Sequence, residues 1–107
     1  VLDSKVAAYE VRGRAATLRG RPLPSGGVNP VHASVSGDGG VLLVANYHGP
    51  DDAADSGGAS VASFKIAPDC SLTPASVVKH SGSSAARGRQ DSAHPHCIVS
   101  ARGGVAY

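Results

Sequence analysis

The sequence predicts an all-β fold made of four-stranded antiparallel sheets that repeat along the chain. Short runs rich in Val, Ala and Leu alternate with turns of Gly, Pro, Ser and Asp, and no window shows a sustained helical period with caps. A pattern of strand, glycine turn and strand occurs twice. Aromatic residues make up 4% of the chain, so it offers few large side chains for a core of its own. We therefore expect sheets that bury their faces against neighbouring sheets.

Eight runs are predicted as strands because each is rich in β-formers and bounded by turn residues. In chain order they are residues 6–11, 17–22, 31–36, 41–46, 61–66, 75–80, 96–100 and 105–107. Glycine or proline turns at residues 37–40, 67–69 and 102–104 separate several of them. Glycine adopts positive φ at little cost, which suits hairpin connections.

The internal repeat is the most informative feature of the sequence. Residues 31–41 (V-H-A-S-V-S-G-D-G-G-V) align with residues 95–105 (P-H-C-I-V-S-A-R-G-G-V), and residues 6–11 align with residues 61–66. Each copy runs as strand, turn, strand, loop, strand, turn, strand, which predicts the four-stranded blade of a β-propeller. The copies lie farther apart than a usual blade, and the Gly/Ser/Asp-rich stretches 50–60 and 81–88 account for the excess as surface loops.

We interpret residues 1–107 as one partial propeller domain. Residues 1–22 are the end of one blade and a linking strand, residues 23–80 a near-complete blade with a loop insertion at 50–60, and residues 81–107 a loop and the start of the next blade. Within the middle blade, residues 31–36 are the innermost strand and residues 75–80 the outermost. Both ends resemble interior points of a longer chain, so we expect the 107 residues alone to be poorly stable and inactive.

Composition argues against several classes of partner. The net charge of +2 comes from scattered arginines without interleaved aromatic rings, so we expect no nucleic-acid partner. No apolar run approaches the ~18–20 residues needed to cross a bilayer, so we expect no membrane partner. Cys70 and Cys97 lack CxxC or metal-finger spacing, and we expect idle thiols in a reducing compartment.

Four segments resemble the lactonase family, which includes the propeller-type 6-phosphogluconolactonases. Residues 24–32 are similar to its S-G-G-x-x-P-x-H/F motif, residues 41–47 to G-x-x-L-L-V-A-N-Y, residues 61–72 to V-x-V-F-x-L…D-G-S-L, and residues 89–96 to R-Q-E-x-P-H-x-H. The chain departs from these motifs at Cys70, Asp91 and Ala93, where Gly, Glu and Pro are commoner. The resemblance implies part of a seven-bladed propeller with four-stranded antiparallel blades.

The last of these segments holds the candidate catalytic residues. His94 and His96 are two residues apart at the entrance of a predicted strand, so in extended chain their side chains face the same side, with Arg89 and Asp91 just upstream. A histidine can act as general acid or base, and an arginine offers a fork of donors for a carboxylate, phosphate or oxyanion. We assign acid/base work to His94 or His96, anion binding to Arg89, and orientation of an imidazole or of Arg89 to Asp91. The resemblance implies that this segment lines the active-site cleft.

Three further residues are candidates for substrate binding, namely His32, Asn46 and Gln90. His32 occupies the position of His96 in the preceding copy, but hydrogen bonding within the fold is the favoured interpretation for His32 and Asn46. His48 and His80 are expected to face solvent. His94 and His96 could share a metal ion, yet Asp91 is the only nearby third ligand, so we predict no metal and no cofactor.

The resemblance implies a metal-independent, cytoplasmic lactone hydrolase similar to 6-phosphogluconolactonase. Such an enzyme converts 6-phosphogluconolactone to 6-phosphogluconate in the pentose phosphate pathway of carbohydrate metabolism, and its partner is the small-molecule sugar lactone. Two alternatives stay open, a carboxymuconate cyclase-type lactonising enzyme and a non-catalytic propeller that serves as a binding scaffold, because propellers host many functions. The sequence leaves the oligomeric state open.

Overall fold

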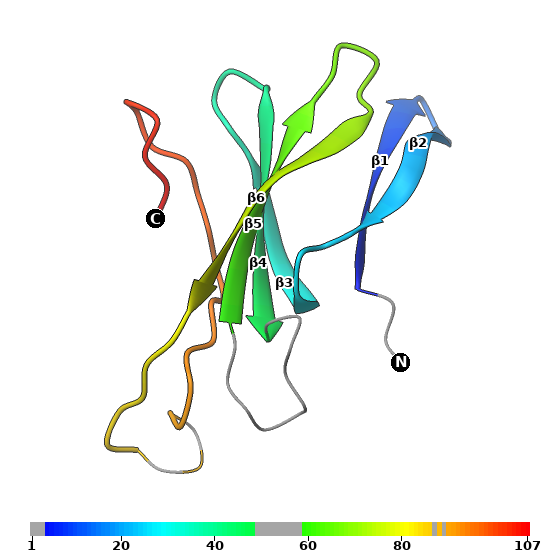
Figure 1. Cartoon of the computed structure of the whole chain (residues 1–107). Helices are drawn as coiled ribbons and strands as arrows, with labels where there is room; N and C mark the ends of the chain where they lie inside the picture. Colours follow the sequence, from blue (N-terminus) through cyan, green and yellow to red (C-terminus); the bar gives the residue numbers. More distant parts are fainter. Residues whose placement is uncertain (1–3, 49–58, 87, 89) are drawn as a thin grey trace.

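The computed structural model describes residues 4–48, 59–86, 88 and 90–107, and all regular elements in this part of the chain are strands (Figure 1). They are β1 (Lys5–Arg12), β2 (Ala15–Pro24), β3 (Val28–Val35), β4 (Val41–His48), β5 (Ala59–Ile66) and β6 (Leu72–His80). The predicted all-β class is confirmed. No helix long and apolar enough to span a membrane occurs among these residues.

The strands form two antiparallel sheets. β1 and β2 make a hairpin, and β3, β4, β5 and β6 form a four-stranded sheet in chain order. A four-stranded meander of this kind is the unit of a propeller blade. Figure 1 shows the hairpin on one side of the four-stranded sheet and residues 90–107 on the other.

An apolar cluster joins the hairpin to the four-stranded sheet. Its fully enclosed members on the sheet are Val44, Ala62 and Phe64, and β2 contributes Leu23. Val44 lies opposite Ala62 in the β4–β5 register, so both side chains point to the same face. Burying one sheet face against strands of a neighbouring sheet is how adjacent blades stabilise one another.

The segment between β2 and β3 crosses this face closely enough to require two glycines. Gly26 has φ of +84°, and a Cβ there would lie 2.8 Å from Ala62 Cβ and 2.9 Å from a methyl group of Val77. A Cβ on Gly27 would lie 2.6 Å from Asn46 Cβ. The two glycines of the S-G-G motif are therefore required for close packing, because any larger side chain would push the segment off the sheet.

The predicted end of the loop insertion was wrong. Ala59 and Ser60 belong to β5 and not to the loop insertion, because both are completely buried and Ser60 pairs with Asn46 of β4. Both residues are small and follow a polar stretch rich in Gly, Ser and Asp, so the sequence gave no sign of that burial. The remainder of the predicted insertion, from residue 50 to residue 58, lies outside the described residues.

The predicted strands 96–100 and 105–107 are not regular strands. Ser100 and Ala106 form an isolated antiparallel bridge, and Val99 exchanges both backbone hydrogen bonds with Tyr107, at 2.8 and 2.9 Å. The hairpin is therefore begun but not extended. Two short segments without a further strand beside them form too few ladder bonds to hold a regular sheet.

Candidate functional site

The candidate site is centred on Tyr47, near the end of β4. The ring of His94 stacks on the Tyr47 ring with a centroid distance of 4.1 Å and an interplanar angle of 6°. Nδ1 of His94 also lies 3.2 Å from the Tyr47 carbonyl oxygen. Since ring and carbonyl both come from β4, the sheet fixes the position of this imidazole.

These contacts also assign the tautomer of His94. A carbonyl oxygen only accepts hydrogen bonds, so Nδ1 carries the proton and Nε2 of the neutral ring has a free lone pair. Ser92 Oγ lies 3.0 Å from Nε2, and its hydroxyl therefore donates to it. His94 thus presents a basic nitrogen to a hydroxyl group, in the arrangement that general-base catalysis requires.

Two further imidazoles complete what we call the Tyr47 cluster, formed by Tyr47, His48, His94 and His96. His96 meets the Tyr47 ring edge-on at 5.2 Å and 84°, and His48 meets the rings of Tyr47 and His94 edge-on at 4.7 and 5.4 Å. His96 is exposed. His48 is half-buried, so the expectation that it faces solvent was wrong, and its Nδ1 is buried without a hydrogen-bond partner among the described atoms.

The structure places His32 against the segment that carries the second copy of the repeat. His32 Nδ1 accepts a hydrogen bond from Ile98 N at 3.3 Å, and its Nε2 lies 3.6 Å from Cys97 Sγ. Ser34, two residues along β3, donates to the Ile98 carbonyl oxygen at 2.6 Å. His32 and Ser34 thus hold both backbone groups of Ile98, and substrate binding by His32 stays a prediction.

Asn46 lies beneath the site, with its side chain completely buried. Its Nδ2 donates to the Ser25 carbonyl oxygen at 3.1 Å and to Ser60 Oγ at 3.3 Å. Its Oδ1 has no partner among the described atoms. In this position Asn46 joins the segment before β3 to β4 and β5, while its predicted contact with substrate stays a prediction.

The loop before His94 contains the other predicted residues. Arg89 lies outside the described residues. Asp91 is exposed and its Oδ2 accepts from Gly88 N at 2.8 Å, so the carboxylate stabilises the loop. Gln90 is exposed, and its backbone pairs with Ala86 and Ser84. The predicted roles of these three residues stay predictions.

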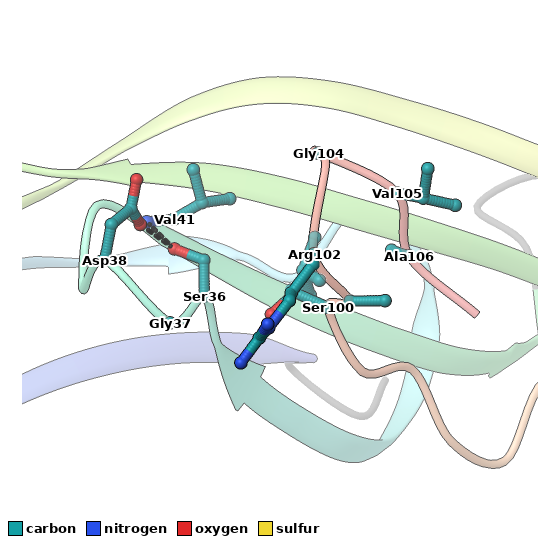
Figure 2. A pocket seen from close by; sticks show the side chains of 11 residues that line it. Ser36, Gly37, Asp38, Val41, Ser100, Arg102, Gly104, Val105 and Ala106 are labelled. Carbon is teal, nitrogen blue, oxygen red and sulfur yellow. Dashed lines mark hydrogen bonds between the residues drawn. The ribbon is translucent and has the colours of Figure 1, made fainter.

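Two hollows lie between the four-stranded sheet and residues 93–107. The larger, of about 660 Å³, has His94 and Cys97 on one side and apolar side chains such as Leu43 and Val61 on the other. The smaller, of about 490 Å³, is bounded by the turns at residues 36–40 and 101–104 (Figure 2).

Among the described residues, Asp38 is the one acidic side chain that lines the smaller hollow. Its Oδ1 accepts from Ser36 Oγ at 2.5 Å (Figure 2). It also accepts from Gly40 N at 3.0 Å. The hydrogen bond from Ser36, followed by that from the Gly40 amide, lowers the pKa of the Asp38 carboxyl. Both partners belong to its own turn, so the carboxylate serves the turn and not a ligand.

Both cysteines are free and exposed. Within the described ranges, no three His, Cys, Asp or Glu side chains gather in a group that could hold a metal ion. The Tyr47 cluster has the imidazoles for proton transfer, and the structure assigns a basic nitrogen to one of them, His94.

A four-stranded antiparallel meander joined by an apolar cluster to a second antiparallel pair is the arrangement expected for part of a β-propeller. The family model for the lactonases, described as a seven-bladed β-propeller, matches residues 2–106. The chain therefore belongs to the lactonase family, as the sequence motifs predicted, and this membership supports a lactonase-type hydrolase function in general. The described residues supply one four-stranded blade and a hairpin of such a propeller. No curated protein and no solved structure gave a significant match.

Sequence reasoning gave no role to two residues of the site. Tyr47 is the last residue of the L-L-V-A-N-Y motif, and Ser92 occupies a variable position of the R-Q-D-S-A-H-P-H segment. The sequence did single out Tyr47, because this aromatic residue ends the motif of a predicted strand. Ser92 carried no signal beyond its two-residue spacing from His94.

Proposed function

We propose that the full-length protein hydrolyses a lactone, with His94 as the general base. The observation that supports this choice is the assigned tautomer of His94, whose Nδ1–H is held by the Tyr47 carbonyl oxygen while Nε2 is free to take a proton. His96 has the same residue type and an exposed ring. It lacks an equivalent backbone contact among the described residues, so nothing in them fixes its tautomer.

The reaction uses His94 twice. Nε2 removes the proton from the oxygen that attacks the lactone carbonyl, and the resulting imidazolium later delivers this proton to the ring oxygen that leaves. The Tyr47 carbonyl oxygen and the face of the Tyr47 ring both stabilise the positive charge in between.

We further propose that the specific lactone is 6-phosphogluconolactone, hydrolysed in the cytoplasm as part of the pentose phosphate pathway. It rests on the resemblance of residues 89–96 to the R-Q-E-x-P-H-x-H motif. In this proposal Arg89 binds the phosphate or the developing oxyanion, since its guanidinium provides parallel donors for oxygen pairs. Neither a metal nor a cofactor takes part.

The test compares two variants of the full-length protein. His94→Asn keeps a donor near the position of Nδ1 and removes the base, so we expect the rate of 6-phosphogluconolactone hydrolysis above the spontaneous rate to fall about 10²- to 10⁴-fold. His96→Asn is the matched control, and we expect it to keep the rate within about tenfold.

Wild-type activity in His94→Asn would exclude His94 as the base. A wild-type protein that does not accelerate hydrolysis of this or other sugar lactones would instead support the alternative of a binding scaffold.

A further inference from the structure

Among the described serines whose hydroxyl donates a hydrogen bond, Ser92 differs from the others in the atom to which it donates. In the described part of the chain, the recorded hydrogen bonds donated by the other serine hydroxyls go to carbonyl or carboxylate oxygens. These donors are Ser25, Ser34, Ser36, Ser60 and Ser71. The Ser92 hydroxyl instead donates to the lone pair of an imidazole nitrogen, 3.0 Å away. A hydroxyl becomes a useful nucleophile when such a base can take its proton.

The base is oriented by a third group, independently of Ser92. His94 is fixed by the Tyr47 carbonyl oxygen at 3.2 Å and by ring stacking at 4.1 Å, and Tyr47 belongs to β4, far from His94 in the sequence. Nucleophile, base and orienting acceptor therefore stand in the order that activates a serine, with a backbone carbonyl in the place of the usual carboxylate. The contact with β4 therefore fixes the position of the imidazole relative to the sheet.

We propose that Ser92 is a catalytic nucleophile that carries the acyl group of a carboxylic ester or lactone during turnover. The choice of a lactone as natural substrate rests on the proposed function, whereas the capacity of Ser92 to be acylated does not.

The first half of the reaction forms an ester on Ser92. Ser92 Oγ bonds to the carbonyl carbon as its proton passes to His94 Nε2, and the carbonyl π electrons move onto oxygen. These electrons then return and break the bond from the carbonyl carbon to the ring oxygen, which takes the proton from His94. The opened substrate is left as an ester of Ser92, with a free hydroxyl at its far end.

The second half uses water in the same way. Water attacks the ester carbon and gives one proton to His94 Nε2, and this proton passes to Ser92 Oγ as the bond between carbon and Oγ breaks. The hydroxy acid leaves and Ser92 is free again, so no oxidant, reductant or metal is required.

The test uses a fluorophosphonate probe on the full-length protein, followed by intact mass measurement and peptide mapping. The probe transfers a phosphonyl group to an activated serine with loss of fluoride, and it needs no lactone. We expect one label at Ser92 in the wild type and no label in Ser92→Ala. We expect labelling at least about 100-fold slower in His94→Asn, because the base is lost. Ser83→Ala, in an exposed stretch of the preceding loop, is the matched control and should label at the wild-type rate.

Lactone hydrolysis is measured in parallel, and we expect Ser92→Ala to lower it about 100-fold. Circular dichroism checks the fold of this variant. The variant Ser92→Cys gives a second measurement, because its thiol should react with iodoacetamide faster than either native cysteine. Label at Ser92 without lactone hydrolysis would support the nucleophile and contradict the proposed function. Lactone hydrolysis without label would overturn the nucleophile, whether or not Ser92→Ala is active, and would leave His94 as a base acting on water.

Discussion

The two copies of the repeated pattern, residues 31–41 and residues 95–105, adopt different structures although their sequences agree at the His, Val, Ser and Gly-Gly-Val positions. The first copy contributes β3 and the start of β4 to a four-stranded sheet. The second copy forms one isolated bridge between Ser100 and Ala106. Their turns are alike, since Gly39 and Gly103 have φ of +76° and +81°. The turn residues thus start the hairpin, and neighbouring strands extend it.

The first copy lies in one sheet with β5 and β6, and Gly26 packs closely against both strands. Disrupting that packing should lower the free energy of unfolding more than any other change proposed here. In Gly26→Ala the new methyl group meets Ala62 and Val77 at under 3.0 Å and the residue keeps φ near +84°. We expect a loss of about 3 kcal/mol of unfolding free energy, the sum of left-handed strain and overpacking. The urea midpoint of the full-length protein measures it.

Gly103→Ala in the second copy is the matched control for this comparison. Its φ is +81°, but a Cβ there would have no atom within 4 Å, so only the backbone strain of about 1–2 kcal/mol applies. If both substitutions shift the urea midpoint equally, the crowding at Gly26 does not contribute and the two copies do not differ in packing.

The sequence predicted the fold wherever local pattern and neighbouring strands agree. The repeat located β3, β4, β5 and β6 to within a few residues at each end, because alternating β-formers and glycine turns are local signals. It failed for residues 96–100, whose strand character depends on partners that local sequence does not specify. Cys70 is a milder case. Its φ of +65° explains why the family motif has glycine there, and the turn still forms around cysteine.

The candidate site was predictable in residue type and not in geometry. His94 and His96 are equivalent in any extended-strand interpretation, and the sequence could not choose between them. The choice comes from the Tyr47 carbonyl oxygen, which a different strand brings to His94 Nδ1. His32 likewise matched His96 by repeat position, yet its ring bonds to the Ile98 backbone. Such contacts join distant residues, so they follow from the topology and not from any motif.

The contact between the copies offers a second way to sharpen the comparison. Ser34 of the first copy donates to the Ile98 carbonyl oxygen of the second at 2.6 Å. Ser34→Ala should cost about 1 kcal/mol, since it leaves this carbonyl without that donor. We expect amide hydrogen exchange to become about fivefold faster at Val99, Ala101 and Tyr107, while the amides of β4 and β5 stay protected.

Thr73→Ala serves as the control for that measurement, because Thr73 is exposed on β6 and lines neither of the two hollows. Unchanged exchange at residues 99–107 in Ser34→Ala would show that the Ser34 hydrogen bond does not hold the second copy, which the His32 contact with Ile98 N would then hold without it.

The smallest expected effect concerns the one turn position at which the copies carry opposite charges, Asp38 in the first and Arg102 in the second. Hydrogen bonds from Ser36 and then from Gly40 lower the pKa of Asp38 in the folded protein. A lowered folded pKa means that the stabilisation is present above the ordinary Asp pKa and is lost as pH falls through the folded value.

Asp38→Asn keeps an acceptor oxygen but no charge, so its urea midpoint should lie slightly below that of the wild type at pH about 6. The difference should shrink as pH falls below the ordinary Asp value near 3.9 and through the lower folded pKa. Arg102→Ala should show no such convergence with the wild type, because the second copy has no carboxylate at this turn position. A gap for Asp38→Asn that stays constant with pH would mean that the charge of Asp38 does not stabilise the turn, and that the two turns differ only in sequence.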